Sequence, residues 1–123
     1  MDESLNKALF QLQSQYQEVS RQIQIVRAQA QARERDRKMT TLTLREIEAL
    51  PRDPPVTCYR GVGRMFVHES RNNIENTLKG KAKEVDDELN VLEKKHKYLE
   101  SEMNTSQSSL RDLLQEVQRQ QQS

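Results

Sequence analysis

Apolar residues recur along the first third of the chain at alternating steps of four and three positions. The members of this series are Leu5, Leu9, Leu12, Tyr16, Val19, Ile23, Val26 and Ala30. The residues between them are mostly Gln, Ser, Glu and Arg, whose polar ends stay in water. An apolar position about every 3.5 residues is the seam of a coiled coil. The spacing therefore predicts a long helix over residues 1–38 with one apolar stripe.

The same alternation returns in the last third of the chain and predicts a second coiled-coil helix over residues 70–117. Its seam consists of Ala82, Val85, Leu89, Leu92, His96, Leu99, Met103, Ser106, Leu110, Leu113 and Val117. Ser70 is the expected N-cap of this helix, because its hydroxyl can accept a hydrogen bond from a free amide. His96 is expected to form a polar layer that fixes the register of the coil. Residues 118–123 are expected to be frayed.

A separate short helix is expected between the two long helices. Thr43 followed by Glu46 fits a capping box, in which the threonine side chain binds a backbone amide while the glutamate reaches back. This short helix would run from Leu44 to Leu50. Pro51 would end it, because proline removes a backbone donor and restricts the residue before it.

A β-hairpin is expected after the proline-rich segment Pro51–Pro55 (PRDPP). Residues 56–60 and 64–68 are rich in β-branched and aromatic side chains, which favour strands. Gly61-Val62-Gly63 lies between them and suits a three-residue hairpin loop, where the backbone visits positive φ. The chain is thus predicted to be one mainly α domain. It is a long antiparallel two-helix coiled coil with a short helix and one β-hairpin inserted between the helices.

This hairpin is not expected to be stable without neighbours. An isolated two-stranded ribbon is marginal in water, and its unpaired edges invite another strand. Alternation places Met65 and Val67 on one face and Phe66 on the other, while the stripes of the two helices are used against each other. We therefore expect residues 39–69 to form an assembly region that other chains complete. The expected contact residues are Cys58, Tyr59, Gly61, Val62, Gly63, Met65, Phe66 and Val67.

The two coil ends far from the hairpin are expected to carry apolar residues with incomplete cover. Phe10 and Leu114 lie off the seam, so a two-stranded coil does not bury them. Exposed apolar residues gathered at one place indicate a contact with another molecule. The residues expected at these tips are Leu5, Leu9, Phe10, Leu12, Leu110, Leu113, Leu114 and Val117.

Charge and composition narrow the classes of partner. The chain carries 20 basic and 19 acidic residues, a net charge of +1. Uniform attraction to nucleic acid or to an anionic membrane needs a basic excess, so neither partner is expected. Cys58 is the single cysteine and has no intrachain partner, which fits a reducing compartment. No apolar run is long enough for a signal peptide or a spanning helix, so we expect a cytoplasmic protein.

Candidate chemistry is sparse. The two glycines around Val62 lack the third glycine and the following Lys-Ser/Thr of a phosphate-binding loop. His68 and Cys58 supply too few ligands for a tetrahedral metal site. No Ser/His/Asp or Cys/His constellation can be assembled, and no core is available to form a cleft around one. The sequence therefore predicts no catalytic, cofactor-binding or metal-binding residues, and no enzyme.

Three stretches together resemble the β-type subunits of eukaryotic prefoldin. They are the hairpin Tyr59–Phe66 (YRGVGRMF), Ser70 at the start of the second helix, and the segment Lys94–Glu100 (KKHKYLE). The resemblance implies a heterohexamer of α-type and β-type subunits, in which the hairpins build a platform and the coils project from it. It also implies a chaperone that works without ATP. In that family the coil tips hold unfolded clients, such as actin and tubulin, and pass them to the cytosolic chaperonin.

Two other classes of function fit parts of the sequence. A structural coiled-coil tether or scaffold would bind native helical partners, but it has no use for a hairpin between its helices. Binding of DNA through Arg33–Lys38 is more remote, because Glu34 and Asp36 interrupt this basic run. A basic region of the zipper type also needs its zipper directly downstream, whereas the seam here lies upstream.

Overall fold

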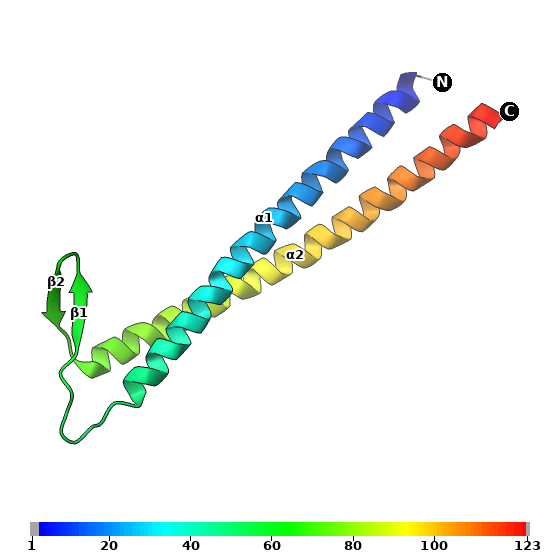
Figure 1. The fold of residues 1–123 in the computed structure, drawn as a ribbon. Coiled ribbons are helices and arrows are strands. Elements are labelled where there is room, and N and C mark those ends of the chain that lie inside the picture. The colour runs from blue at the N-terminus through cyan, green and yellow to red at the C-terminus, as the bar shows by residue number, and fades with distance from the viewer. Residues whose placement is uncertain (1–2, 123) are drawn as a thin grey trace. The chain divides into compact units, whose positions relative to one another are not determined.

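The computed structural model describes residues 3–122 of the chain (Figure 1). Helix α1 (Glu3–Glu48) is followed by strand β1 (Tyr59–Val62), strand β2 (Met65–His68) and helix α2 (Arg71–Gln122). The predicted fold class is confirmed, since two long helices flank one small antiparallel sheet. The described residues form two compact units, residues 3–30 with 91–122 and residues 31–90. Within residues 3–122, no stretch of helix is both apolar enough and long enough to cross a membrane.

The unit formed by residues 3–30 and 91–122 is an antiparallel pair of helix segments. Its core consists of the buried residues Ile23, Val26 and Leu99, with Val19, Leu92 and Met103 packed against them. All six residues belong to the predicted seams, so the 3.5-residue pattern identified the core of this unit. The core of this unit is small, and burial of its one apolar stripe stabilises the pairing of the two helix segments.

His96 forms the expected polar layer of this unit. The Arg27 Nε donates a hydrogen bond to His96 Nε2 at 3.4 Å, and His96 Nδ1 lies 3.5 Å from a carboxylate oxygen of Glu100. Because Arg27 and His96 come from different helices, the contact is satisfied in one register of the pair. A polar contact of this kind specifies alignment more than it adds stability.

The unit formed by residues 31–90 contains the end of α1, the hairpin and the start of α2. Between the helices, Arg33 lies 3.5 Å from Glu88 and Arg37 lies 3.7 Å from Asp86. Val85 is buried at its predicted seam position. Cross-helix ion pairs at the surface contribute little stability, but they favour this alignment over one that places like charges together.

The separate short helix between residues 44 and 50 is not formed, because α1 continues without a break to Glu48. The Thr43 hydroxyl donates to the carbonyl of Met39 at 2.8 Å, so it bonds back into its own helix rather than capping a new one. Within the charged stretch before it, Arg33 pairs with Asp36 and Arg37 pairs with Glu34, one turn apart. These contacts within the helix keep the segment helical where the apolar seam stops.

The N-terminal end of α2 agrees with the sequence prediction, and its C-terminal end does not. Ser70 is the N-cap, since its Oγ accepts a hydrogen bond from the backbone amide of Asn73 at 3.2 Å. The expected frayed tail is wrong for residues 118–122, which are helical, while Ser123 lies outside the described residues. Glutamine and arginine are good helix formers, and Arg119 lies 3.6 Å from Glu116 one turn earlier.

The hairpin loop is shorter than expected, and the first strand begins later in the sequence than expected. Strand register pairs Tyr59 with His68, Arg60 with Val67, Gly61 with Phe66 and Val62 with Met65. The loop is therefore the two residues Gly63-Arg64, not three, and Gly63 has a φ of 60°. A glycine at positive φ in the first loop position is typical of a type II′ turn, whose twist matches that of the strands.

One arginine joins the end of α1 to the start of α2. The guanidinium of Arg71 donates to the carbonyls of Glu48 and Leu50, each at 2.9 Å, and to that of Pro51 at 3.3 Å. It also pairs with the buried carboxylate of Glu75 at 3.0 Å. We name this set of contacts the Arg71 clamp. It caps the carbonyl end of α1, which the proline-rich segment leaves without helical partners.

Replacing Arg71 by alanine is expected to lower the free energy of unfolding by about 2–4 kcal/mol, because hydrogen bonds to a charged group are lost and Glu75 is left buried without its partner. Arg71→Lys keeps the charge but lacks the forked guanidinium that reaches several acceptors at once. It should lower the free energy of unfolding by about half as much. Urea unfolding followed by circular dichroism at 222 nm measures both. Arg52→Ala removes an exposed arginine nearby and is the control. A loss for Arg71→Ala no larger than that of the control would contradict the clamp.

Candidate functional site

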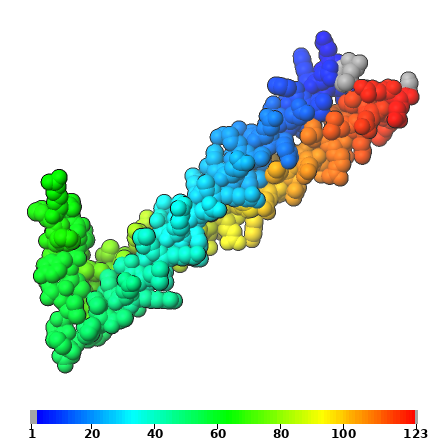
Figure 2. All heavy atoms as spheres, in the orientation of Figure 1, coloured from blue at the N-terminus to red at the C-terminus, as the bar shows by residue number. Residues whose placement is uncertain are grey.

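The hairpin presents apolar side chains on both of its faces. Its register places Val62, Met65 and Val67 on one face and Tyr59 and Phe66 on the other. Every residue of both strands is exposed, and Phe66 is 77% accessible. In Figure 2 the hairpin forms a separate projection of its unit (green). Both faces therefore lack the cover that a sheet of this composition requires.

Glycine at position 61 explains why the ring of Phe66 stands uncovered. Gly61 lies directly opposite Phe66, and a Cβ at Gly61 would be in ordinary contact with the ring, 3.8 Å away. Because glycine has no side chain, the cross-strand neighbour adds no side-chain cover to the ring.

Side-chain and backbone contacts hold the base of the hairpin. The Tyr59 and His68 rings meet edge to face at 5.9 Å between centroids. The amide of Glu69 donates to the carbonyl of Cys58 at 3.1 Å, and the Glu69 carboxylate lies 3.0 Å from Arg60. Cys58 is half-buried here, unlike the other predicted contact residues, which are all exposed.

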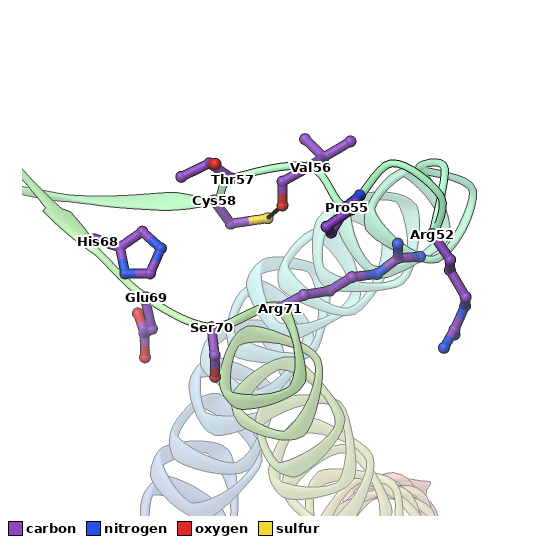
Figure 3. A pocket seen from close by; sticks show the side chains of 9 residues that line it. All are labelled: Arg52, Pro55, Val56, Thr57, Cys58, His68, Glu69, Ser70 and Arg71. Atoms are coloured by element: carbon purple, nitrogen blue, oxygen red, sulfur yellow. Dashed lines mark hydrogen bonds between the residues drawn. The ribbon is translucent and has the colours of Figure 1, made fainter.

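Two cavities flank the base of the hairpin within the unit of residues 31–90. One, of about 480 Å³, has a mostly apolar lining. It includes Ile47, Tyr59, Gly61, Ile74 and Leu78. The second, of about 470 Å³, is lined by more polar groups. Figure 3 shows its lining, with His68, Glu69 and Ser70 on one side and Arg52 and Arg71 on the other.

The apolar cavity shares lining residues with strand β1 of the hairpin. Among residues 3–122 there is no group of three or more His, Cys, Asp and Glu side chains placed to hold a metal ion. The apolar cavity adjoins the exposed hairpin, so a segment that covers the hairpin can also fill the cavity. Ile74 and Leu78, which are half-buried in α2, were not among the site residues predicted from the sequence.

Arg71 was also missed by sequence reasoning, although the sequence carries a signal for it. A basic residue in the first turn of a helix opposes the helix dipole, and the first turn of α2 contains no acidic residue. Arg71 pairs with Glu75 of its own helix, and the carbonyl end of α1 provides its further acceptors. The signal predicts that a partner exists, but the identity of that partner depends on the fold.

The start of α1 and the end of α2, which carry the predicted tip residues, lie at the same end of the unit of residues 3–30 and 91–122 (Figure 1). Phe10 is 70% accessible and Leu114 is also exposed, as expected for residues off the seam. Leu5, Leu9, Leu12, Leu110 and Leu113 are half-buried. The prediction of incomplete cover is wrong for Val117, which is only 7% accessible. Val117 therefore packs within the helix pair and offers little surface to a partner.

The chain matches known proteins over nearly its whole length. A family model described as "Prefoldin subunit" matches residues 10–117. Prefoldin subunit 1 of Danio rerio is 31% identical over 93% of this chain and 92% of the relative. Prefoldin subunit 1 of Arabidopsis thaliana is 30% identical over 94% of this chain and 88% of the relative.

A solved structure supports the same assignment. The crystal structure of the prefoldin beta subunit from Thermococcus strain KS-1 covers 85% of this chain, with a TM-score of 0.78 and 25% identity. The alignment spans 90% of that subunit, so the likeness extends beyond one helix pair. The chain therefore belongs to the prefoldin family of chaperone subunits and is similar to its β-type members, prefoldin subunit 1 in particular.

Proposed function

We propose that this chain is one subunit of a hexameric chaperone that holds unfolded proteins without ATP and passes them to the cytosolic chaperonin. As a prefoldin, it assembles with other prefoldin subunits, and its family is one of chaperones rather than enzymes. The hexamer, its α-type and β-type neighbours and its cytoplasmic location are part of the proposal. So are its clients, unfolded chains such as actin and tubulin.

The observation that carries the proposal is a hairpin with apolar residues exposed on both faces. Covering about 100 Å² of such surface is worth roughly 2.5 kcal/mol. Strands from neighbouring subunits would pair with the edges of β1 and β2 and bury Val62, Met65 and Phe66. The exposure of both faces supports a role of the hairpin as the assembly element. Tyr59, Gly61, Gly63 and Val67 belong to the same element. Cys58 would contribute at its half-buried base.

The tips support the holding role. Phe10 and Leu114 offer apolar surface that the helix pair does not bury. Their half-buried neighbours can add contact area when a client lies across the end. A single tip binds weakly, but several tips that act on one client give avidity without tight individual contacts. Release then needs only a competing apolar surface, so no hydrolysis step is required.

Co-expression with α-type and β-type prefoldin subunits, followed by native mass spectrometry, tests the proposal. We expect a complex of six chains that contains this subunit and suppresses aggregation of denatured actin in the absence of ATP. A stable monomer whose hairpin amides resist hydrogen exchange at high dilution would refute the assembly role. A hexamer that does not slow aggregation would refute the holding role and leave the assembly role intact.

The turn of the hairpin provides a finer test of assembly. Gly63→Ala places a side chain at a φ of 60°, which costs about 1–2 kcal/mol for an L-residue. The concentration needed for half-maximal assembly should therefore rise about fivefold to thirtyfold, measured by native mass spectrometry on a dilution series. Gly80→Ala is the matched control, since Gly80 lies in α2 outside the hairpin, its added Cβ would meet nothing within 4 Å and its φ is not positive. Equal shifts for the two variants would contradict the role assigned to the turn.

A further inference from the structure

A second exposed apolar surface lies on α2, outside both the hairpin and the tips. Val91 and Tyr98 are 64% and 63% accessible, and neither belongs to the coil seam. They stand seven residues apart, which is two helical turns, so they share one face of α2. Their neighbours Leu92 and Leu99 point into the helix pair, where Leu99 is buried. Val91 and Tyr98 therefore face away from the partner helix.

Two lysines lie on the same face between these apolar residues. Lys94 and Lys95 follow Val91 by three and four positions and precede Tyr98 by four and three positions. Residues at these spacings are direct neighbours on a helix surface. We name the set Val91, Lys94, Lys95 and Tyr98 the α2 side patch. The aliphatic stems of the lysines extend its apolar area while their ammonium groups stay in water.

The charges of this patch are not balanced from within the chain. Lys97 lies 3.6 Å from Glu93, and His96 lies 3.5 Å from Glu100, so the adjacent basic groups have acidic partners. Lys94 and Lys95 form no ion pair or hydrogen bond with any residue between positions 3 and 122. The patch thus combines two unpaired positive charges with two exposed apolar side chains.

We propose that the α2 side patch is a docking surface for an acidic amphipathic segment of another protein. Such a segment would place one apolar side chain against Val91 and one against Tyr98. Its carboxylates between them would meet Lys94 and Lys95. The two apolar anchor points are about 10 Å apart along the helix, which matches residues seven apart on a docked helix. This contact is independent of the assembly and holding roles proposed above.

Charge complementarity favours an acidic polypeptide over nucleic acid. Two unpaired lysines neutralise few phosphates, and the chain as a whole carries a net charge of +1. Tyr98 could stack on a base, but the aliphatic Val91 offers no such contact. A peptide that joins carboxylates to aliphatic side chains satisfies all four residues of the patch.

The probe is a fluorescein-labelled helical peptide of about fourteen residues, built of Leu, Glu and Ala, with leucines seven apart and glutamates between them. Fluorescence anisotropy measures its binding to the full chain at low ionic strength. The Lys94→Glu/Lys95→Glu variant should bind it about tenfold or more weakly, and Tyr98→Ser several-fold more weakly. Lys81→Glu/Lys83→Glu is the matched control, because it reverses two exposed lysines of the same helix outside the patch. Circular dichroism checks that all variants keep their helix content.

Four outcomes would overturn the proposal. The first is no measurable binding of the peptide, and the second is equal weakening by the patch variant and its matched control. The third is loss of binding in a Phe10→Ser/Leu114→Ser variant with none in the patch variant, which would place the peptide at the tips. The fourth is tighter binding of a single-stranded oligonucleotide than of the peptide, which would identify the patch as a nucleic-acid surface.

Discussion

Replacing Met65 and Phe66 by serine is expected to abolish assembly of this chain with other prefoldin subunits while both helices persist. The two side chains lie on opposite faces of the hairpin, so the double variant removes an apolar anchor from each face. Burial of a methionine or phenylalanine contributes about 1.5–3 kcal/mol. Losing both should weaken association by about two to four orders of magnitude. Native mass spectrometry of the co-expressed subunits measures the fraction of variant in the complex.

The control for this experiment removes similar side chains from another exposed site. Val91→Ser/Tyr98→Ser changes two exposed apolar residues of α2, outside residues 39–69, and leaves the hairpin untouched. It should assemble as the unmodified chain does. Circular dichroism of each isolated variant tests whether the helices are retained. Normal assembly of the hairpin variant would show that the exposed faces of β1 and β2 are not the subunit contact.

Replacing Phe10 and Leu114 by serine is expected to impair the holding of unfolded clients without affecting assembly. Both side chains are exposed and lie outside the core of their unit, so the helix pair loses little when they change. A client, in contrast, loses two apolar contacts worth about 1.5–3 kcal/mol each. About tenfold more complex should then be needed to suppress aggregation to the same extent, because tips of other subunits still contribute. Light scattering of diluted, denatured actin measures the suppression.

Native mass spectrometry separates a holding defect from an assembly defect in this experiment. The Phe10→Ser/Leu114→Ser variant should form the same complex at the same concentration as the unmodified chain. Val117→Ala is an informative companion, because Val117 is buried between the helices rather than offered to a client. It should lower the melting temperature of the coil more than it changes aggregation. Full suppression by the tip variant would show that clients bind elsewhere.

Periodicity identified the helices and their cores because both depend on local spacing. Ile23, Val26 and Leu99 could be placed in a core from sequence alone, since a stripe that repeats every 3.5 residues has one side to bury. The same reasoning failed at Thr43, where a capping pattern was also compatible with a helix interior. Its hydroxyl bonds to Met39, a choice that depends on whether the preceding charged turn stays helical. The ion pairs Arg33–Asp36 and Arg37–Glu34 favour helix in that turn, and a capping rule does not take such pairs into account.

Contacts between distant segments could not be predicted in the same way. The turn at Gly63 needed the strand register, which shifts if the first strand begins at Tyr59 rather than at Val56. The Arg71 clamp joins Arg71 to carbonyls 20 to 23 positions earlier, and only the fold brings them together. Burial of Val117 likewise depends on how far the opposing helix extends. Among the candidate site residues, the sequence could supply the exposed aromatic ring of Phe66 and the off-seam positions of Phe10 and Leu114.

Because the Arg71 clamp holds one end of the proline-rich segment, this segment can accept inserted residues. Its bonds to Glu48, Leu50 and Pro51 fix one end of that segment, and the bond between Glu69 and Cys58 fixes the other. Residues 51–57 between these anchors are all exposed. Doubling the length of a flexible loop whose ends are already held costs only about 0.6 kcal/mol. A fluorophore or a short tag inserted there would report on the chaperone without displacing its strands, and natural insertions would be tolerated for the same reason.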